Sequence, residues 1–275
     1  MVEPRDASTL IVLREGAGAA VEVFCVKRHE KSGFMGGAIV FPGGKVDSAD
    51  SDAAWSHCCT TPSRRGLEFA DGEPALRALA IAACREAFEE AKLLPVTGRA
   101  LSDDDLANVS GDLLGYLSAN GLKLDLTALV PFARWVTPTV ESRRFDARFF
   151  LTSAPPGQSG AHDNHETTES FWARPADVLD NFFRGQVQLA PPTERTLELL
   201  ASVSSIAGAH ALANASDLAP VCPELVSHHD AFGETLALAL PGDPAHSIQV
   251  ARSIGKSRFV LREGRWLPED PPTNI

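Results

Sequence analysis

Three glutamates in the segment 85–90, Arg-Glu-Ala-Phe-Glu-Glu, are the residues of this chain best placed to do chemistry. In a helix with about 100° per residue, Glu86, Glu89 and Glu90 fall within one arc of roughly 100°. Like charges at this spacing repel each other, so no structural need explains them. Carboxylate oxygens are the ligands of hard divalent cations, and magnesium also keeps waters and substrate phosphates. The pattern therefore indicates a metal site for phosphate chemistry.

A glycine turn about 40 residues upstream favours this interpretation. Pro42-Gly43-Gly44 directly follows the apolar run 38–41, which predicts a strand that ends where the backbone can approach a ligand or a helix closely. The alternative is a solvated acidic face balanced by Arg85, which can reach Glu89 at the i, i+4 distance. The opposite arc of the helix is apolar, which predicts that it packs on a core while the acids face a cleft or solvent.

Together these motifs resemble the signature of the Nudix hydrolase superfamily, in which a Gly-Gly turn leads to a helix with Arg-Glu, two residues and Glu-Glu. Gly44 and Arg85 are separated by 40 residues. This spacing exceeds the usual one and places an insertion at 47–72. Counted back from Arg85, the position of the family's first glutamate is occupied by Arg77. Lys92 occupies the position where a glycine normally closes the helix.

A narrower resemblance runs from about residue 8 to about residue 208. The runs 33–38, 40–44 and 46–47, and later 135–138 and 144–150, are similar to the Nudix branch with a long insertion in the box. This branch includes peroxisomal coenzyme A diphosphatases and bacterial relatives. The resemblance implies an α/β fold, specifically an α-β-α sandwich with a mixed β-sheet.

The resemblance also implies roles for single residues. A further glutamate often lies six residues before the tryptophan of a late strand, and counting back from Trp172 gives Glu166; the alternative is a polar loop. Arginines at predicted strand ends could hold phosphates, although each alone is more often a surface charge. The expected metal ligands are Glu86, Glu89 and Glu90, the catalytic residues Glu89, Arg85 and Glu166, and the substrate-binding residues Gly43, Gly44, Arg28 and Arg144.

Composition narrows the class of protein. The net charge of −11 over 275 residues argues against a nucleic-acid duplex as partner. No apolar stretch approaches the ~20 residues that span a bilayer, and the start lacks the pattern of a signal peptide, so we expect a cytoplasmic protein without a membrane partner. Five cysteines, an odd number, predict reduced thiols rather than a disulfide framework. A homodimer is compatible with the sequence.

Periodicity and turn residues predict the order of the elements. The expected strands are 9–14, 21–28, 132–136, 145–152 and 170–173, and the expected helices start at Glu73-Pro74, cover 101–120 as one helix, and cover 175–184 and 192–202. The insertion 47–72 reads as a surface segment with one helical turn. Residues 1–208 are expected to form the Nudix domain and 209–275 a β-rich extension.

These patterns predict a pyrophosphohydrolase that depends on Mg²⁺ or Mn²⁺. Its expected substrate is a small nucleoside diphosphate derivative, with coenzyme A or acyl-coenzyme A as the leading candidate. ADP-ribose or a dinucleoside polyphosphate fits the same metal centre. A non-catalytic nucleotide sensor with this fold is the alternative from another class, and Arg77 and Lys92 are the residues that favour it.

Overall fold

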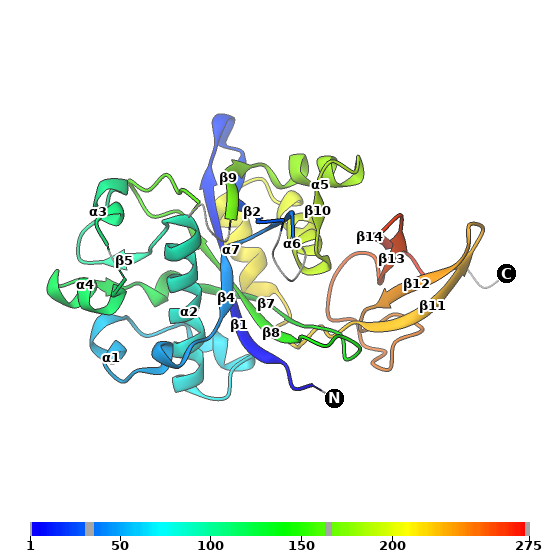
Figure 1. Ribbon diagram of the computed structural model, residues 1–275, viewed down its shortest axis with the longest axis horizontal. Coiled ribbons are helices and arrows are strands. Elements are labelled where there is room, and N and C mark those ends of the chain that lie inside the picture. The colour runs from blue at the N-terminus through cyan, green and yellow to red at the C-terminus, as the bar shows by residue number, and fades with distance from the viewer. Residues whose placement is uncertain (1, 31–35, 110, 163–166, 273–275) are drawn as a thin grey trace.

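A computed structural model describes residues 2–30, 36–109, 111–162 and 167–272, and shows a mixed β-sheet between two layers of helices (Figure 1). The strands of this sheet are β1 Arg5–Glu15, β2 Val21–Arg28, β3 Ala38–Val40, β4 Gly43–Lys45, β7 Val130–Val136, β8 Phe145–Ser153, β9 Thr167–Ala173 and β10 Gln188–Leu189. Their order is β10-β3-β2-β1-β8-β7, with β4 also paired to β1 and β9 to β2. The pairs β1–β8 and β10–β3 are parallel and the others antiparallel. The expected α-β-α sandwich is confirmed.

The central strand β1 supplies side chains to both cores because successive residues of a strand point to opposite faces. Leu10 and Val12 belong to the core under α2, whereas Ile11 and Leu13 belong to the core under the opposite helices. The strand is longer than the expected 9–14 because it pairs with β8 from Arg5 onward. This double burial fixes the register of β1, and β1 in turn positions the glycine turn of β4.

The helices form two layers on the two faces of this sheet (Figure 1). One layer contains α1 Trp55–Cys58, α2 Glu73–Ala91, α3 Asp103–Ala107 and α4 Leu113–Ala119, and the other contains α5 Pro175–Phe183, α6 Pro191–Ala201 and α7 Ile206–Ala215. The 3-10 turns are η1 Ala17–Ala19, η2 Ser48–Ser51, η3 Arg64–Glu68 and η4 Leu126–Ala128, and β5 Val96–Thr97 pairs with β6 Lys123–Leu124.

Helix α2 starts where the sequence predicts and ends without a glycine. Pro74 occupies one of its first positions, where a missing N–H costs little. Lys92 closes the helix in the left-handed conformation, with φ of 52°, and its N–H donates to the carbonyls of Ala87 and Phe88. The Lys92 ammonium lies 4.5 Å from the centre of the Phe88 ring. A lysine therefore provides the C-cap that the resemblance assigned to glycine.

The single helix expected over 101–120 is wrong. The structure has two short helices instead, α3 and α4, each opened by its own cap. Ser102 accepts from the Asp105 N–H, and Asp112 accepts from the Gly115 N–H. Gly111 between them has a positive φ of 66°. A capping residue that bonds to the local backbone competes with a continuous helix, and here it prevails.

The insertion 47–72 contains the expected helical turn, α1, and many exposed residues, but it is not confined to the surface. Trp55 is 4% exposed and Phe69 is 1% exposed, and both belong to the core under α2. The Arg65 guanidinium donates to backbone carbonyls of Pro131, Ala213 and Ser216, which lie far away in the sequence. The insertion is thus a structural part of the domain, and its removal would open the core.

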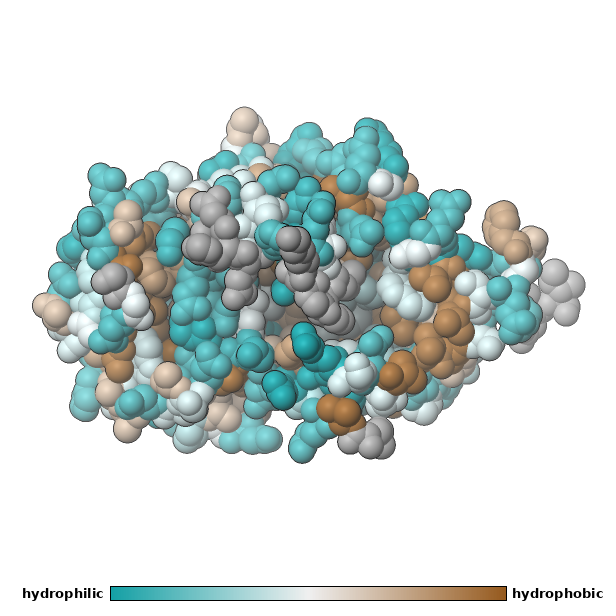
Figure 2. All heavy atoms as spheres, in the orientation of Figure 1, coloured by the Kyte–Doolittle hydropathy of each residue, from teal (hydrophilic) through white to brown (hydrophobic). Residues whose placement is uncertain are grey.

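Beyond α7, the chain forms a four-stranded antiparallel sheet of β11 Glu224–Asp230, β12 Gly233–Ala239, β13 Arg258–Arg262 and β14 Arg265–Glu269. Apolar side chains gather over it on the face in Figure 2, and Leu225 and Leu236 are among its exposed residues. The expected boundary at 208 falls inside α7, whose Ala209 and Ala213 are buried against the main sheet.

Two further sequence expectations can be compared with the structure. All five cysteines are free thiols. Among the helices described, none is both long and apolar enough to cross a bilayer.

A buried acid lies near the start of α6. Glu194 is 1% exposed and its Oε2 has no hydrogen-bond partner among the described residues. Burial raises the pKa of Glu194 to about 7, with a smaller opposing effect of Arg195. The folded protein therefore holds this proton more tightly than the unfolded chain does.

We expect this acid to make stability depend on pH. Between about pH 4.5 and 7 the unfolded state loses the Glu194 proton first, so the free energy of unfolding falls as the pH rises. The loss is roughly 3 kcal/mol at about 1.4 kcal/mol per pH unit. In Glu194→Gln, urea unfolding at pH 4.5, 6 and 8 should lack this decrease relative to the unmodified protein. The exposed Glu3→Gln is the matched control, and a decrease retained in Glu194→Gln would contradict the assignment.

Candidate active site

The close approach of α2 to β4 depends on two glycines. An ideal Cβ on Gly44 would lie 2.5 Å from the carboxylate of Glu86, and one on Gly43 would lie 2.5 Å from the Ser8 carbonyl oxygen. The Gly43 N–H donates to Glu90 Oε2 at 3.0 Å. Glu86 and Glu90 therefore face the glycine turn rather than open solvent, and Glu90 is only 5% exposed.

Arg85 connects the acids to the surrounding backbone. Its guanidinium donates to Glu86 Oε1 at 2.8 Å, to Glu89 Oε2 at 3.0 Å and to the Lys45 carbonyl at 2.9 Å. It also donates to both carboxylate oxygens of Asp50, at 2.9 and 3.0 Å. Planar guanidinium suits such bidentate pairing, which fixes geometry as well as charge. The expected grouping of Arg85 with Glu86 and Glu89 is thus present in the structure.

Asp50 is a residue that sequence reasoning missed. It lies in η2 at the start of the insertion, is 1% exposed, and also accepts the Asp47 N–H at 2.8 Å. Counting from the arginine placed the family's first acid at Arg77, which instead lines a cavity beside the insertion. Asp50 follows Gly44 by six residues, so a count from the glycine side would have found it. Most of the insertion follows this acid, and only tertiary folding brings Asp50 back to Arg85.

The charges around Arg85 keep it ionised. Burial disfavours its charge, but the hydrogen bonds that it donates to Asp50 and the nearby charges of Glu86, Asp50 and Glu89 outweigh burial and raise the pKa of Arg85 above its ordinary value. The Arg85 side chain is 14% exposed and that of Glu89 is 52% exposed. Arg85 therefore remains a fixed cation beside a carboxylate that reaches water.

The donor set fits a hard divalent cation. Glu86 and Glu90 face the glycine turn, and Glu89, on the same helix, shares the Arg85 guanidinium with Glu86. All three offer carboxylate oxygens, the ligand type of magnesium and manganese. The missing Cβ atoms leave this edge of the turn accessible to the carboxylates.

The other expected site residues lie in three different situations. Arg28 ends β2, and its buried Nε has no hydrogen-bond partner in the described part of the chain. Arg144 is 7% exposed and donates to the backbone carbonyls of Thr137 and Val2, a structural role, so we leave it out of the site. Glu166 lies outside the described residues. Thr167, which follows it, pairs with Arg28 in the sheet.

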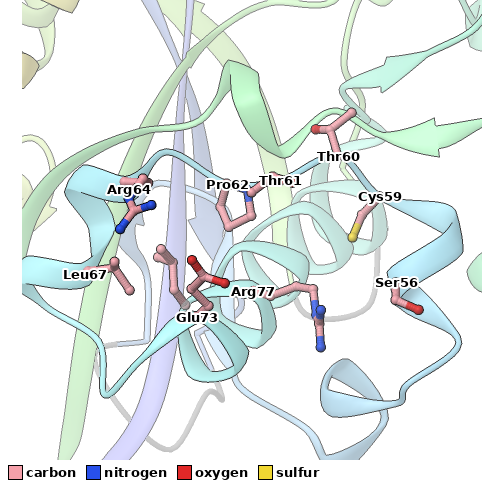
Figure 3. A pocket seen from close by; sticks show the side chains of 10 residues that line it. Ser56, Cys59, Thr60, Thr61, Pro62, Arg64, Leu67, Glu73 and Arg77 are labelled. Atoms are coloured by element: carbon pink, nitrogen blue, oxygen red, sulfur yellow. The ribbon is translucent and has the colours of Figure 1, made fainter.

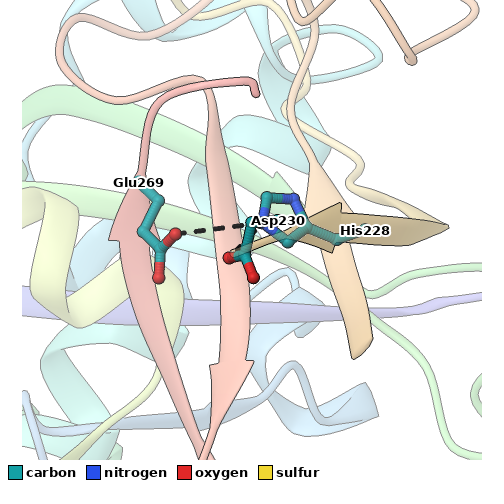
Figure 4. Close-up of side chains that lie close together, drawn as sticks. All are labelled: His228, Asp230 and Glu269. Atoms are coloured by element: carbon teal, nitrogen blue, oxygen red, sulfur yellow. Dashed lines mark hydrogen bonds and ion pairs between the residues drawn. The ribbon is translucent and has the colours of Figure 1, made fainter. Parts of the chain in front are cut away.

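A second cluster of possible metal ligands lies in the C-terminal sheet. Single ligand atoms of His228, Asp230 and Glu269 lie within 4.8 Å of one another (Figure 4). Arg262, however, pairs with both Asp230 and Glu269. Arg258 donates to Nδ1 of the His228 ring at 3.1 Å. These contacts form an ion-pair network within the sheet.

Comparisons with known proteins show the family of this chain. A family model described as the NUDT19 Nudix domain matches residues 5–200. The chain is 27% identical over 238 residues to acyl-coenzyme A diphosphatase NUDT19 of Xenopus laevis, and 30% identical over 244 residues to that of Gallus gallus. These matches cover 69% of this chain and 62% and 63% of the relatives. The chain thus matches slightly less than two thirds of their length.

A solved structure supports the fold independently. The crystal structure of a NUDIX hydrolase from Alicyclobacillus acidocaldarius has a TM-score of 0.66 and 30% identity to this chain, and it covers 77% of this chain and 97% of its own. The chain therefore belongs to the Nudix hydrolase family. Within that family, it belongs to the group described by the NUDT19 Nudix domain, as the inserted box predicted.

We predict that Asp50→Asn weakens the fold around Arg85. Asparagine keeps the size of aspartate but removes the charge, so Arg85 would stay ionised with one anion fewer. Glu86 and Glu89 remain as partners, so the free energy of unfolding should fall by about 2 kcal/mol rather than by the larger cost of an isolated buried charge. Urea unfolding measures this loss, with the exposed Asp180→Asn as the matched control. Equal stability of the two variants would contradict an anchoring role for Asp50.

Proposed function

We propose that this chain is a divalent-metal-dependent pyrophosphohydrolase. Its substrate is a nucleoside diphosphate linked to another moiety, with coenzyme A or acyl-coenzyme A as the leading candidate. The observation that carries the proposal is the placement of Glu86 and Glu90 against the Gly43-Gly44 turn. Arg85, fixed by Asp50, holds Glu86 and Glu89 in the same group.

Glu86, Glu89 and Glu90 would hold Mg²⁺ or Mn²⁺. When bound, such an ion supplies Lewis acidity toward phosphate oxygens and lowers the pKa of a coordinated water. Glu89 is half exposed, so it can accept a proton from an attacking water and pass it to solvent. Arg85 orients the carboxylates, and Glu166 remains a proposed further ligand or base.

Arg28 is the arginine that best fits a phosphate of the substrate. Its carbonyl accepts the Gly37 N–H at 3.1 Å, which fixes the backbone at the end of β2. In the ranges that the structure describes, its side chain forms no ion pair, in contrast to the paired Arg85. A guanidinium with free donors can form charge-assisted hydrogen bonds to a phosphate.

The sensor alternative rests on Arg77 and Lys92, and the structure supports catalysis instead. Asp50 provides the carboxylate that the family's first glutamate would supply and that Arg77 does not. Lys92 adopts the backbone conformation expected of glycine. All three central glutamates are retained. The two departures therefore leave the carboxylate centre unchanged.

The names of the relatives favour coenzyme A derivatives over other nucleoside diphosphates. We further propose that the substrate is a small molecule, that nucleic acid and membranes are not partners, and that the enzyme acts in the cytoplasm. The division into a Nudix domain at 1–208 and an extension at 209–275, and a possible homodimer, also remain proposals.

We expect Glu89→Gln and Glu90→Gln each to lower kcat by at least ~100-fold, because each variant removes one carboxylate charge from the metal centre and keeps the volume. Turnover with magnesium and with manganese would be measured beside urea unfolding curves. The exposed Glu15→Gln should keep both its rate and its stability. Near-normal rates in both centre variants would show that the carboxylates are not the metal site.

Substrate preference can be tested with a single phosphate group. Hydrolysis of coenzyme A at the diphosphate should yield 3′,5′-ADP and 4′-phosphopantetheine, identified by mass. We expect kcat/KM for coenzyme A to exceed that for its analogue without the 3′-phosphate by ~10-fold, or about 1.4 kcal/mol, because an arginine can bond to the extra phosphate. Faster cleavage of ADP-ribose or of a dinucleoside polyphosphate than of either compound would assign the site to those substrates instead.

A further inference from the structure

The cavity that Arg77 lines lies between the insertion and the first turns of α2 (Figure 3). Its volume is about 130 Å³, well above what one ordered water needs. The insertion forms one wall with residues 56–67, and Glu73, Leu76 and Arg77 of α2 form the other. In Figure 3 the Glu73 side chain lies between those of Arg64 and Arg77. Two cations thus line one small cavity of a chain whose net charge is −11.

Arg64 and Arg77 have no side-chain partner among the described residues that would give them a structural role. Neither Arg64 nor Arg77 forms an ion pair or a side-chain hydrogen bond with any residue that the structure describes. Arg65, next to Arg64 in the sequence, shows the contrast, because its guanidinium donates to three backbone carbonyls. Arg64 is exposed and Arg77 is half-buried. The free donors therefore remain available to a ligand.

The cavity is separate from the carboxylate centre. Arg77 precedes Glu86 by nine residues, which in an α-helix is about 13 Å along the axis and about half a turn around it. Glu86 faces β4, so Arg77 faces the insertion on the other side of α2. A ligand in this cavity would contact neither the glycine turn nor Glu90.

We propose that this cavity binds the phosphate group of a small phosphorylated metabolite between Arg64 and Arg77. A phosphate monoester carries close to two negative charges at neutral pH and presents several acceptor oxygens. Two guanidinium groups match both properties better than they match a single carboxylate. The N-terminal turn of α2 adds favourable partial positive charge, because Gly72 provides no side-chain cap for its N–H groups.

Glu73 should affect phosphate affinity in the opposite direction to the two arginines. Its carboxylate lines the same cavity and opposes an anion, so neutralising it should strengthen phosphate binding. Removing either arginine should weaken binding. A phosphate bound elsewhere on the chain would not respond to both changes in opposite directions.

Isothermal titration of the full chain with inorganic phosphate, in EDTA and at constant ionic strength set with chloride, tests the proposal. We expect Arg64→Met and Arg77→Met each to weaken phosphate binding by at least ~10-fold, and Glu73→Gln to tighten it several-fold. Arg143→Met, an exposed arginine outside the cavity, should bind like the unmodified chain. Arg64 is exposed, so its variant reports on binding without disturbing the core.

The Glu86→Gln/Glu90→Gln double variant separates this site from the proposed active site. It should keep its phosphate affinity in EDTA, whatever happens to hydrolysis. The proposal is overturned if the unmodified chain binds no phosphate, if Arg143→Met weakens binding as much as Arg64→Met, or if the Glu86→Gln/Glu90→Gln variant loses binding. Unchanged or weaker affinity in Glu73→Gln would likewise place the phosphate outside this cavity.

Discussion

The bidentate ion pair between Arg85 and Asp50 is the interaction on which the candidate site depends. A largely buried guanidinium is stable only when anions and carbonyls satisfy it, and Arg85 has both. The same guanidinium contacts Glu86 and Glu89, so the pair transmits the position of the insertion to the carboxylates. The insertion 47–72 interrupts the Nudix motif in the sequence, and through Asp50 it also becomes part of the candidate site.

The second constraint on the candidate site is that Gly43 and Gly44 have no side chains. Helix α2 approaches β4 so closely that a Cβ on Gly44 would collide with Glu86, and the Gly43 N–H reaches Glu90. Strand β1 determines where this turn lies, because it pairs with β4 and is buried on both faces. The candidate site thus rests on a strand that is paired and buried on both faces, which suits carboxylates that must hold one geometry.

Helix α2 separates two opposite electrostatic environments. Toward β4 it presents Glu86 and Glu90, and toward the insertion it presents Arg77. A net charge of −11 therefore says little about either local field. One long helix fixes the relative positions of an acidic centre and a basic cavity, and the insertion contacts both through Asp50 and Arg64.

The sequence by itself determined the start of α2 and singled out the three glutamates, because both depend on local spacing and periodicity. The family and the mixed sheet between helical layers followed from the resemblance that its motifs carry. Tertiary structure alone revealed the partner of Arg85, since Asp50 lies 35 residues away and no local pattern joins them. It also decided that the insertion is buried through Trp55 and Phe69, and that Arg144 bonds to backbone. Burial and the partners of charged groups are set by long-range packing, which a linear pattern does not encode.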